Sequence, residues 1–294
     1  MIKNKKKLTI GIPTFKRNKY LIKSLNCLKN QTFRKFDLYV SNNSTDRNDI
    51  DKINNIKKKF QKEKFYFTIF HQKKNIRAIK NLFFLLKKSK SKYFLWLSDD
   101  DELSPESIKI MIEDLEKNKD VVTMVPYWAH FIAPKNYKLI KPYFSDSRFT
   151  IIRVIKFLYK GDDAFFYGLH KANILKKCKY FKFWNINKSI LNWAYPFIFQ
   201  LILKGKIKLV RNKKAIWYNR EYTLKHTLPK KNKKNNNNIN FFYKKILKYL
   251  NLIYLYNKII YINKKYIILL IFLINLPILL SFKTLNFIMK HFKI

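Results

Sequence analysis

Short apolar runs alternate with longer amphipathic stretches along the first 125 residues of the chain. Each apolar run is rich in Ile, Leu, Val or aromatic residues and is bounded by polar ones, which is typical of buried β-strands. These predicted strands lie at residues 8–12, 36–40, 65–70, 93–97 and 121–125. Apolar residues three or four positions apart predict helices at residues 18–30, 48–62 and 76–88. Pro13 is expected to end the first strand, and Ser104 and Pro105 to cap and open a further helix.

The alternation of strand and helix predicts the fold class. It favours an α/β, Rossmann-like, mostly parallel sheet with helices on both faces. Ligands of such sheets bind beyond the carboxyl ends of the strands. The polar segments that follow the first, second and fourth strands are therefore the expected walls of a site: Pro13–Arg17, Ser41–Asp46 and Ser98–Glu102.

The character of the chain changes after about residue 225. Residues 227–240 are polar and rich in Lys and Asn, which is typical of a linker. Residues 241–294 contain no acid and include an uncharged run of 17 residues, 266–282. As a helix this run is at the short limit for crossing a bilayer, and Pro277 weakens a spanning helix. We expect a basic, hydrophobic helical tail that dips into a membrane; a true span and a buried helix pair are the alternatives.

Charge adds to this picture. The chain has 63 Lys and Arg against 18 Asp and Glu, a formal net charge of +45. Such a charge suits an anionic membrane surface or nucleic acid, although an AT-rich coding sequence would produce much of the same bias. Only four glycines are present and none forms a Gly-x-Gly pair, which excludes the dinucleotide fingerprint and the phosphate-binding P-loop.

Because acids are scarce, the run Asp99-Asp100-Asp101-Glu102 at the end of a predicted strand is informative. Adjacent carboxylates repel one another unless a positive group holds them. A hard divalent cation bound by Asp99 and Asp101 would do so, and would leave coordination positions for phosphates. The alternative is an acidic capping loop ahead of the next helix.

Several segments resemble, in order and spacing, the family 2 glycosyltransferases of surface-glycan type. They are Leu8–Arg17 (LTIGIPTFKR), Gln31–Phe33 (QTF), Phe36–Asp46 (FDLYVSNNSTD), Asn75–Asn81 (NIRAIKN) and Tyr93–Leu103 (YFLWLSDDDEL). The last resembles the Asp-x-Asp strand of that family. The resemblance covers about residues 8–125 and implies the GT-A fold, with a glycosyltransferase domain over 1–226. Its nucleotide-sugar half would occupy about 1–125 and its acceptor half about 126–226.

The resemblance also implies roles for individual residues. The residues that would line the base and ribose of a nucleotide sugar are Pro13, Thr14, Phe15 and Arg17. Asp99 would face the ribose or sugar, with Asp100 beside it in the donor site. Asp101, with Asp99, would ligate Mg²⁺ or Mn²⁺ bridging the diphosphate, and the metal would stabilise the leaving nucleotide.

Two departures from the family pattern affect the donor site. Ser41 or Asn42 replaces the acid that reads the base, and the amide of Asn42 still offers a donor and an acceptor to a base edge. Arg77 replaces the usual glycine. Its guanidinium either contacts phosphate or is solvated, and the sequence leaves both open.

The catalytic base is harder to place. An inverting transferase needs a carboxylate to accept the proton of the acceptor hydroxyl. No acid lies in residues 185–200, where the family pattern would put one, and Glu221 is the only acid after Asp163. We therefore expect Asp163, or else Asp162, to be the base, although the two acids also fit an ordinary turn after Gly161.

These features predict a metal-dependent, inverting glycosyltransferase at the cytoplasmic face of the inner or plasma membrane, bound peripherally or monotopically. It would move a sugar from a nucleotide-sugar donor to a lipid-linked or membrane-associated glycan acceptor in surface polysaccharide or lipopolysaccharide assembly. A basic nucleic-acid-binding protein and a catalytically degenerate, membrane-bound GT-A scaffold are the alternatives. We do not expect a nucleic-acid partner, because three adjacent aspartates would repel phosphate without a metal.

Overall fold

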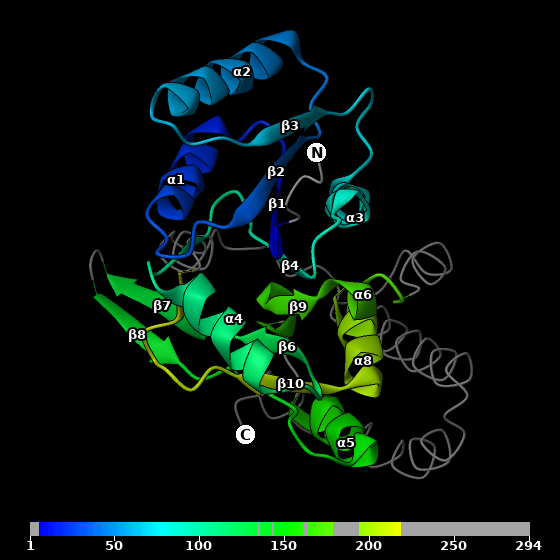
Figure 1. Ribbon diagram of the computed structural model, residues 1–294. Helices are drawn as coiled ribbons and strands as arrows, with labels where there is room; N and C mark the ends of the chain where they lie inside the picture. The colour runs from blue at the N-terminus through cyan, green and yellow to red at the C-terminus, as the bar shows by residue number, and fades with distance from the viewer. Residues whose placement is uncertain (1–5, 134–135, 143, 161–163, 179–193, 219–294) are drawn as a thin grey trace, which may run out of the picture. The chain divides into compact units, whose positions relative to one another are not determined.

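A computed structural model describes residues 6–133, 136–142, 144–160, 164–178 and 194–218 (Figure 1). The chain divides into two compact units. Unit 1 spans Met1–Phe144, Ala164–Lys177 and Ile207–Lys231. Unit 2 spans Ser145–Asp163, Cys178–Lys206 and Asn232–Ile294.

Seven strands of the described residues form one sheet in the order β10-β6-β9-β4-β1-β2-β3. Their bounds are β1 (Leu8–Thr14), β2 (Phe36–Asn42), β3 (Thr68–His71), β4 (Tyr93–Trp96), β6 (Val121–Val125), β9 (Leu169–Lys171) and β10 (Lys206–Leu209). β1 pairs in parallel with β2 and β4, and β2 pairs in parallel with β3. β9 runs antiparallel to β4 and β6. The predicted mostly parallel sheet is confirmed.

Helices cover both faces of this sheet, as the sequence pattern predicted. Those of unit 1 are α1 (Asn18–Lys29), α2 (Arg47–Lys62), α3 (Ala78–Lys88), α4 (Ser107–Lys117) and the short α6 (Ala172–Leu175). α1 and α2 lie on one side of the strands β1–β3, and α3 lies on the other (Figure 1). The apolar positions of α1 point inward, because Leu21, Leu25 and Leu28 are fully buried.

The prediction that Pro13 ends the first strand is wrong. β1 continues to Thr14, and Pro13 pairs with Ser41 of β2. On the other side of β1, the pairing with β4 has already ended at Gly11 opposite Trp96. Since no further strand residue pairs on that side, proline's missing N–H interrupts no ladder there.

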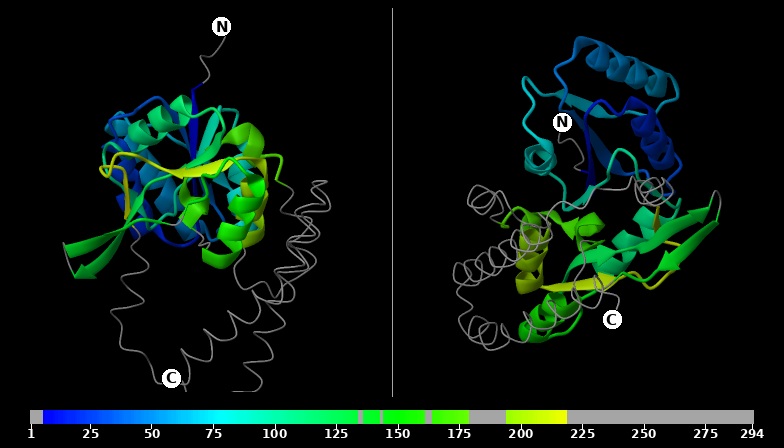
Figure 2. Two further views of the ribbon diagram at one scale, coloured as in Figure 1. Left: turned by 90° about the horizontal axis from the view of Figure 1, so that it is seen from below. Right: turned by 180° about the vertical axis from the view of Figure 1, so that it is seen from behind.

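A second, four-stranded sheet within unit 1 has the order β5-β11-β7-β8. Its strands are β5 (Glu102–Leu103), β7 (Tyr127–Ala133), β8 (Asn136–Ile140) and β11 (Ile216–Tyr218). Figure 2 shows the β7–β8 hairpin projecting from the seven-stranded sheet. The acidic segment therefore leads from β4 of one sheet directly into β5 of the other.

Ser104 does not cap the following helix, so that prediction is wrong as well. α4 begins at Ser107, and its N-cap residue, Glu106, makes no side-chain capping bond. The Ser104 hydroxyl instead lies 2.6 Å from that of Ser107, and it accepts a 3.0 Å hydrogen bond from the amide of Ile216 in β11. Ser104 belongs to the junction of the second sheet, and the tertiary contact replaces the local cap.

A glycine lets α3 approach the sheet closely. A Cβ at Gly11 of β1 would lie 3.0 Å from Leu85 Cβ of α3 and 3.0 Å from the Phe94 ring. Any larger residue would push α3 away from β1. Because α3 carries residues of the pocket described below at its amino end, this contact helps to fix that wall.

Unit 2 contains α5 (Thr150–Lys160) and α8 (Tyr195–Lys204), which pack together. Arg153 on α5 is buried and donates from Nε to the Ile202 carbonyl at 3.1 Å. It also donates from Nη1 to the Ser147 carbonyl at 2.8 Å. The guanidinium thus ties the two helices to the segment before α5.

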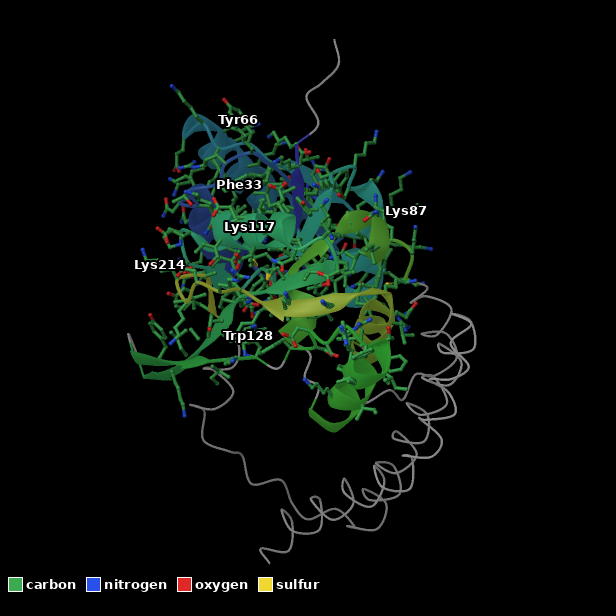
Figure 3. The ribbon with its side chains drawn as sticks, turned by 60° about the horizontal axis from the view of Figure 1, so that its bottom comes forward. Phe33, Tyr66, Lys87, Lys117, Trp128 and Lys214 are labelled. Carbon is green, nitrogen blue, oxygen red and sulfur yellow. The ribbon has the colours of Figure 1, made fainter. Side chains whose placement is uncertain are left out.

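The basic side chains of unit 1 lie mainly on its outside. Lys87, Lys117 and Lys214, which are labelled in Figure 3, are among the exposed ones. Within the described ranges, no helix combines the length and apolarity needed to cross a bilayer. The predicted linker, residues 227–240, and the predicted tail, residues 241–294, lie outside the described residues.

Candidate active site

The three aspartates of the acidic segment are all buried at the end of β4. Asp99, Asp100 and Asp101 are 4%, 4% and 3% exposed. Three adjacent carboxylates with so little access to water need compensating donors and positive charge. Each carboxylate has a hydrogen-bond donor of its own, and Asp99 and Asp100 also share Arg17.

Asp99 is held by the residues that end β1. Thr14 donates from its hydroxyl to Asp99 Oδ2 at 2.7 Å, and Arg17 Nη1 lies 3.4 Å from Asp99 Oδ1. Burial nevertheless raises the pKa of Asp99 from 3.8 to about 6, with repulsion from Asp100 adding to it; the Thr14 bond and the Arg17 charge only partly offset the rise. Asp99 therefore carries a negative charge that the protein compensates incompletely.

Arg17 joins the neighbouring acid as well. Its Nη2 donates to Asp100 Oδ2 at 2.5 Å, while Ser98 donates from its hydroxyl to Asp100 Oδ1 at 2.6 Å. The guanidinium also lies over the Tyr20 ring, with 5.0 Å between its central carbon and the ring centroid. One arginine thus bridges two of the three aspartates.

Asp101 faces the second sheet. The indole Nε1 of Trp217, in β11, donates to Asp101 Oδ2 at 2.9 Å. The backbone carbonyl of Asp101 accepts from the Ser24 hydroxyl of α1 at 2.8 Å. Trp217 lies 116 residues from Asp101 along the chain, and no local sequence pattern links the two.

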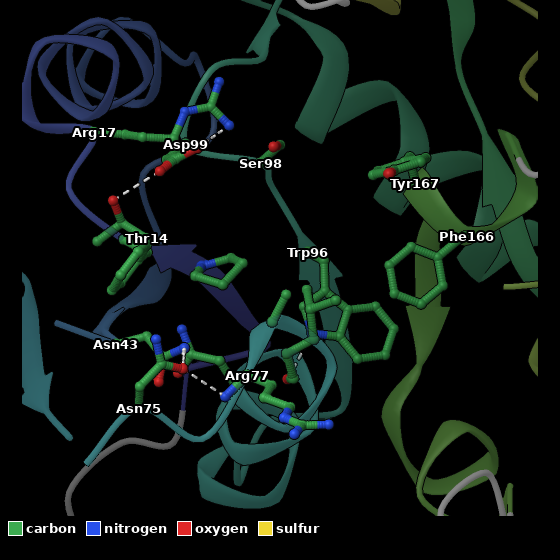
Figure 4. A pocket seen from close by; sticks show the side chains of 15 residues that line it. Thr14, Arg17, Asn43, Asn75, Arg77, Trp96, Ser98, Asp99, Phe166 and Tyr167 are labelled. Carbon is green, nitrogen blue, oxygen red and sulfur yellow. Dashed lines mark hydrogen bonds and ion pairs between the residues drawn. The ribbon is translucent and has the colours of Figure 1, made fainter. Parts of the chain in front are cut away.

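A pocket of about 460 Å³ opens at the carboxyl ends of β1 and β4 (Figure 4). It is lined by Pro13, Thr14, Phe15, Arg17, Asn43, Asn75, Arg77, Ala78, Asn81, Leu82, Trp96, Ser98, Asp99, Phe166 and Tyr167. The expected walls after the first, second and fourth strands all contribute to it. The structure thereby brings together six of the predicted site residues: Pro13, Thr14, Phe15, Arg17, Arg77 and Asp99.

Asp100 and Asp101 do not line this pocket, and neither does Asn42. Its side chain is fully buried, its Oδ1 accepts from the amide of Ser44 at 3.0 Å, and its Nδ2 lies 3.4 Å from His71 Nδ1. The adjacent residue Asn43 lines the pocket instead. Because side chains alternate along a strand, a shift of one residue decides which of the two asparagines reaches the ligand side.

Arg77 directly precedes α3 and has a positive φ of 67° with an extended ψ of 158°. A residue with a Cβ is strained there by about 1–2 kcal/mol, which agrees with the glycine of the family pattern. Asn75 Oδ1 stabilises the turn by accepting from the Arg77 amide at 2.8 Å and from Asn43 Nδ2 at 2.9 Å. Within the described residues the Arg77 guanidinium makes no ion pair, and its side chain lines the pocket.

The opposite wall is aromatic. Trp96 and Phe166 stack with centroids 4.5 Å apart and planes 11° apart, and Tyr167 lies beside them (Figure 4). Fully buried His170 lies 2.9 Å from the Phe166 carbonyl through Nε2 and 2.9 Å from the Thr123 hydroxyl through Nδ1. Burial lowers the pKa of His170 to about 4, so its neutral ring donates to the carbonyl and accepts from the hydroxyl. Sequence inspection missed this wall because its residues come from distant segments.

The acidic residues suit a hard divalent cation chemically. Magnesium in enzymes is often held by one or two carboxylates together with substrate phosphates. Asp99 lines the pocket, and its raised pKa shows that its charge is under-compensated. Across the described part of the chain, no three His, Cys, Asp or Glu side chains form a metal-binding group. A carboxylate at the pocket wall, Asp99, thus fits a cation shared with a bound ligand.

The predicted base cannot be placed in this way. Asp162 and Asp163 lie outside the described residues. The same holds for residues 185–193 of the segment in which the family pattern puts an acid.

A mostly parallel sheet flanked by helices, with a buried acidic loop beside a pocket at the strand ends, is the arrangement of the GT-A fold. The model of the family "Glycosyl transferase family 2" matches residues 9–191, and the chain belongs to this family. The resemblance found in the sequence is thereby confirmed, and so is the prediction of an enzyme.

Solved structures agree with this fold. Residues 1–349 of S. aureus TarS superpose with a TM-score of 0.53 at 15% identity, covering 72% of this chain and 60% of that one. Their complex with UDP-GlcNAc superposes with a TM-score of 0.52 at 16% identity, covering 72% of this chain and 58% of that one. GalNAc-T7 with UDP, GalNAc and Mn²⁺ superposes with a TM-score of 0.51 at 11% identity, covering 74% of this chain and 44% of that one. The chain thus spans less than two thirds of these proteins. At such identities the likeness establishes the fold alone.

A search of curated proteins found no match.

Proposed function

We propose that this glycosyltransferase is metal-dependent and inverting, and that it moves a sugar from a nucleotide-sugar donor to a lipid-linked or membrane-associated glycan. The product would belong to a surface polysaccharide or lipopolysaccharide. The observation that carries the proposal is the 460 Å³ pocket, in which a buried, under-compensated carboxylate, Asp99, faces the space beside Arg17. A pocket of this size suits a small polar ligand.

Residues of the pocket wall support the binding of a nucleotide-sugar donor. Phe15 is 44% exposed and lies next to Pro13 at the end of β1, so both rings are available to a nucleotide base. Asn43 would take the base-edge role predicted for Asn42, because Asn43 lines the pocket. Thr14 and Arg17 would hold Asp99 against the ribose.

Asp99 and Asp101 would hold Mg²⁺ or Mn²⁺ together with the donor diphosphate. A cation there, when bound, stabilises the negative charge that develops on the leaving nucleoside diphosphate. The protein's own contribution is to keep the carboxylates buried and oriented, through Thr14, Arg17 and Trp217. The solved GalNAc-T7 complex contains Mn²⁺, which supports this reading.

The acceptor and the location are argued from the sequence. The acid-free segment 241–294, with its uncharged run 266–282, suits the surface of an anionic membrane. A lipid-linked acceptor would then be presented at the cytoplasmic face of the membrane that holds the tail. Asp163, or Asp162, would accept the proton of the acceptor hydroxyl as the new bond forms.

Donor binding and hydrolysis by the full chain test the proposal. Purified protein is titrated with UDP, GDP, UDP-GlcNAc and GDP-mannose with and without Mn²⁺, and release of the nucleoside diphosphate is followed. We expect one donor to bind and turn over with Mn²⁺, and Asp101→Ala to abolish turnover. Asp51→Asn, which changes an exposed acid of α2 that pairs with Arg47, is the matched control and should behave like the wild type.

Three results would count against the proposal. Full activity in EDTA would exclude the metal. Tight, salt-sensitive RNA binding without affinity for any nucleotide sugar would favour a nucleic-acid-binding role. Binding without turnover on any lipid-linked acceptor in anionic vesicles would point to a degenerate scaffold.

A further inference from the structure

Trp217 contacts the acidic segment from the far end of the described chain. It is fully buried in β11, and its Nε1 lies 2.9 Å from Asp101 Oδ2. β11 pairs antiparallel with β5, and Trp217 lies opposite Leu103, two residues after Asp101. The strand pairing therefore brings the indole to the carboxylate.

The indole N–H donates a hydrogen bond, which the ring of phenylalanine could not do. Indole is only a donor, and a buried donor without a partner is costly. Asp101 is 3% exposed, so its carboxylate oxygens depend on protein donors in place of water. A hydrogen bond from the indole N–H to a carboxylate oxygen is directional, which fixes the orientation of Asp101.

The ring itself is held rigidly. Trp217 stacks on Trp128 of β7, with planes 13° apart and centroids 6.4 Å apart. It also contacts Tyr167, at 5.5 Å between centroids. Since Tyr167 lines the pocket, one buried ring supports both the acidic segment and the aromatic wall.

We propose that Trp217 is a positioning residue for the donor site: through its indole N–H it holds the Asp101 carboxylate in the orientation in which Asp101 takes part in binding metal and diphosphate. This inference rests on the proposed function. Trp217 itself touches neither donor nor metal, and acts through Asp101.

Trp217→Phe removes the N–H and keeps an aromatic ring. Mn²⁺ binding, and UDP binding in the presence of Mn²⁺, are measured by calorimetry on the full chain. We expect both affinities to fall about 10- to 100-fold, as is usual when the partner that orients a metal ligand is lost. Trp128→Phe, which shortens the neighbouring ring of the same stack, is the matched control. It should leave both affinities within about twofold of the wild type while disturbing the packing to a similar degree.

A double-mutant cycle separates positioning from general packing. In an Asp101→Ala background, Trp217→Phe should cause no further loss of UDP affinity, because the residue through which it acts is gone. If Trp217→Phe does not fold, Trp217→Tyr is used, and the indole N–H resonance of the wild type is followed during titration with Mg²⁺ and UDP. We expect that resonance to shift on binding.

The outcomes are distinct. Wild-type protein that binds no nucleoside diphosphate with Mn²⁺ overturns the proposed function and this inference with it. If the wild type binds and Trp217→Phe binds equally well, the inference alone is overturned. The same holds if Trp217→Phe lowers the UDP affinity as much in the Asp101→Ala background as in the wild type. An unshifted Trp217 resonance at saturation has the same consequence.

Discussion

Replacing Asp99 by Asn is expected to stabilise the ligand-free protein at neutral pH while abolishing donor binding. The side chain is 4% exposed and lies at the pocket wall. Asparagine has nearly the same shape, and its carbonyl can still accept from the Thr14 hydroxyl. The substitution therefore removes a buried negative charge and leaves most of the packing in place.

The size of the effect follows from the pKa of Asp99. Burial raises this pKa from 3.8 to about 6, so the folded protein holds a proton that the unfolded chain has already released. At about 1.36 kcal/mol per pH unit, ionisation of Asp99 lowers the free energy of unfolding by roughly 3 kcal/mol above pH 6. The penalty shrinks as the pH falls from 6 towards 3.8. Because the amide of asparagine would face Arg17 less favourably, we expect a gain of about 1–3 kcal/mol at pH 7.5.

His170 has the opposite dependence over nearly the same range. Burial lowers its pKa from 6.5 to about 4, so the unfolded chain gains a proton first as the pH falls, and stability is lost between those values. In the wild type the contributions of Asp99 and His170 largely cancel between pH 4 and 6. In Asp99→Asn only the His170 contribution remains, so between pH 6 and 4 the free energy of unfolding should fall by about 1.4 kcal/mol for each pH unit.

Urea denaturation in EDTA at pH 4.5, 5.5 and 7.5, followed by tryptophan fluorescence, measures these free energies. The exposed-acid variant Asp51→Asn is the control and should track the wild type. A lower stability of Asp99→Asn than of the wild type at pH 7.5 would refute the reasoning. So would a difference between the two proteins that does not change with pH.

Three further predictions follow from the described geometry. Arg77→Gly should raise the free energy of unfolding by about 1 kcal/mol, because it relieves a positive φ, and should weaken UDP binding measured by calorimetry. Lys64 also has a positive φ but lies outside the pocket, so Lys64→Gly should stabilise the protein without changing UDP binding. Equal UDP affinity in the two variants would show that the Arg77 guanidinium is only solvated. Gly11→Ala should cost about 1–3 kcal/mol in chemical denaturation, since its Cβ would lie 3.0 Å from Leu85 and Phe94; unchanged stability would show that α3 yields freely. Removal of divalent cations by EDTA should abolish donor turnover, and Mn²⁺ should restore it; activity that survives EDTA would exclude a metal role.

Much of the fold could be predicted because its signals are local. The apolar runs and amphipathic stretches of residues 8–125 are short-range patterns, and the helices they predict begin and end within about two residues of α1, α2 and α3. The errors arose where tertiary contacts override a local preference. Pro13 stays in β1 because no neighbouring strand needs its N–H, and Ser104 serves β11 rather than α4.

The site residues also differ in whether a local pattern or a tertiary contact identifies them. Asp99 and the loop after β1 were predicted because acids are scarce and strand-end loops converge in a parallel sheet. Asn43 was missed because the sequence does not fix which of two adjacent asparagines faces the ligand. Trp217 and Phe166 were missed because only the folded chain brings them near the acidic segment.

The separation of 116 residues between Trp217 and Asp101 has a consequence for synthesis and truncation. β4 and β5, on either side of the acidic segment, belong to different sheets, and β5 gains its partner only when β11 has emerged from the ribosome. The nucleotide-sugar half is therefore not a self-sufficient module, although its own strands pair locally. A nascent or truncated chain that stops before residue 216 would have β1 to β4 in place and an acidic segment without its second anchor. Such contacts between distant positions form late in folding, so the donor site should be among the last parts of unit 1 to mature.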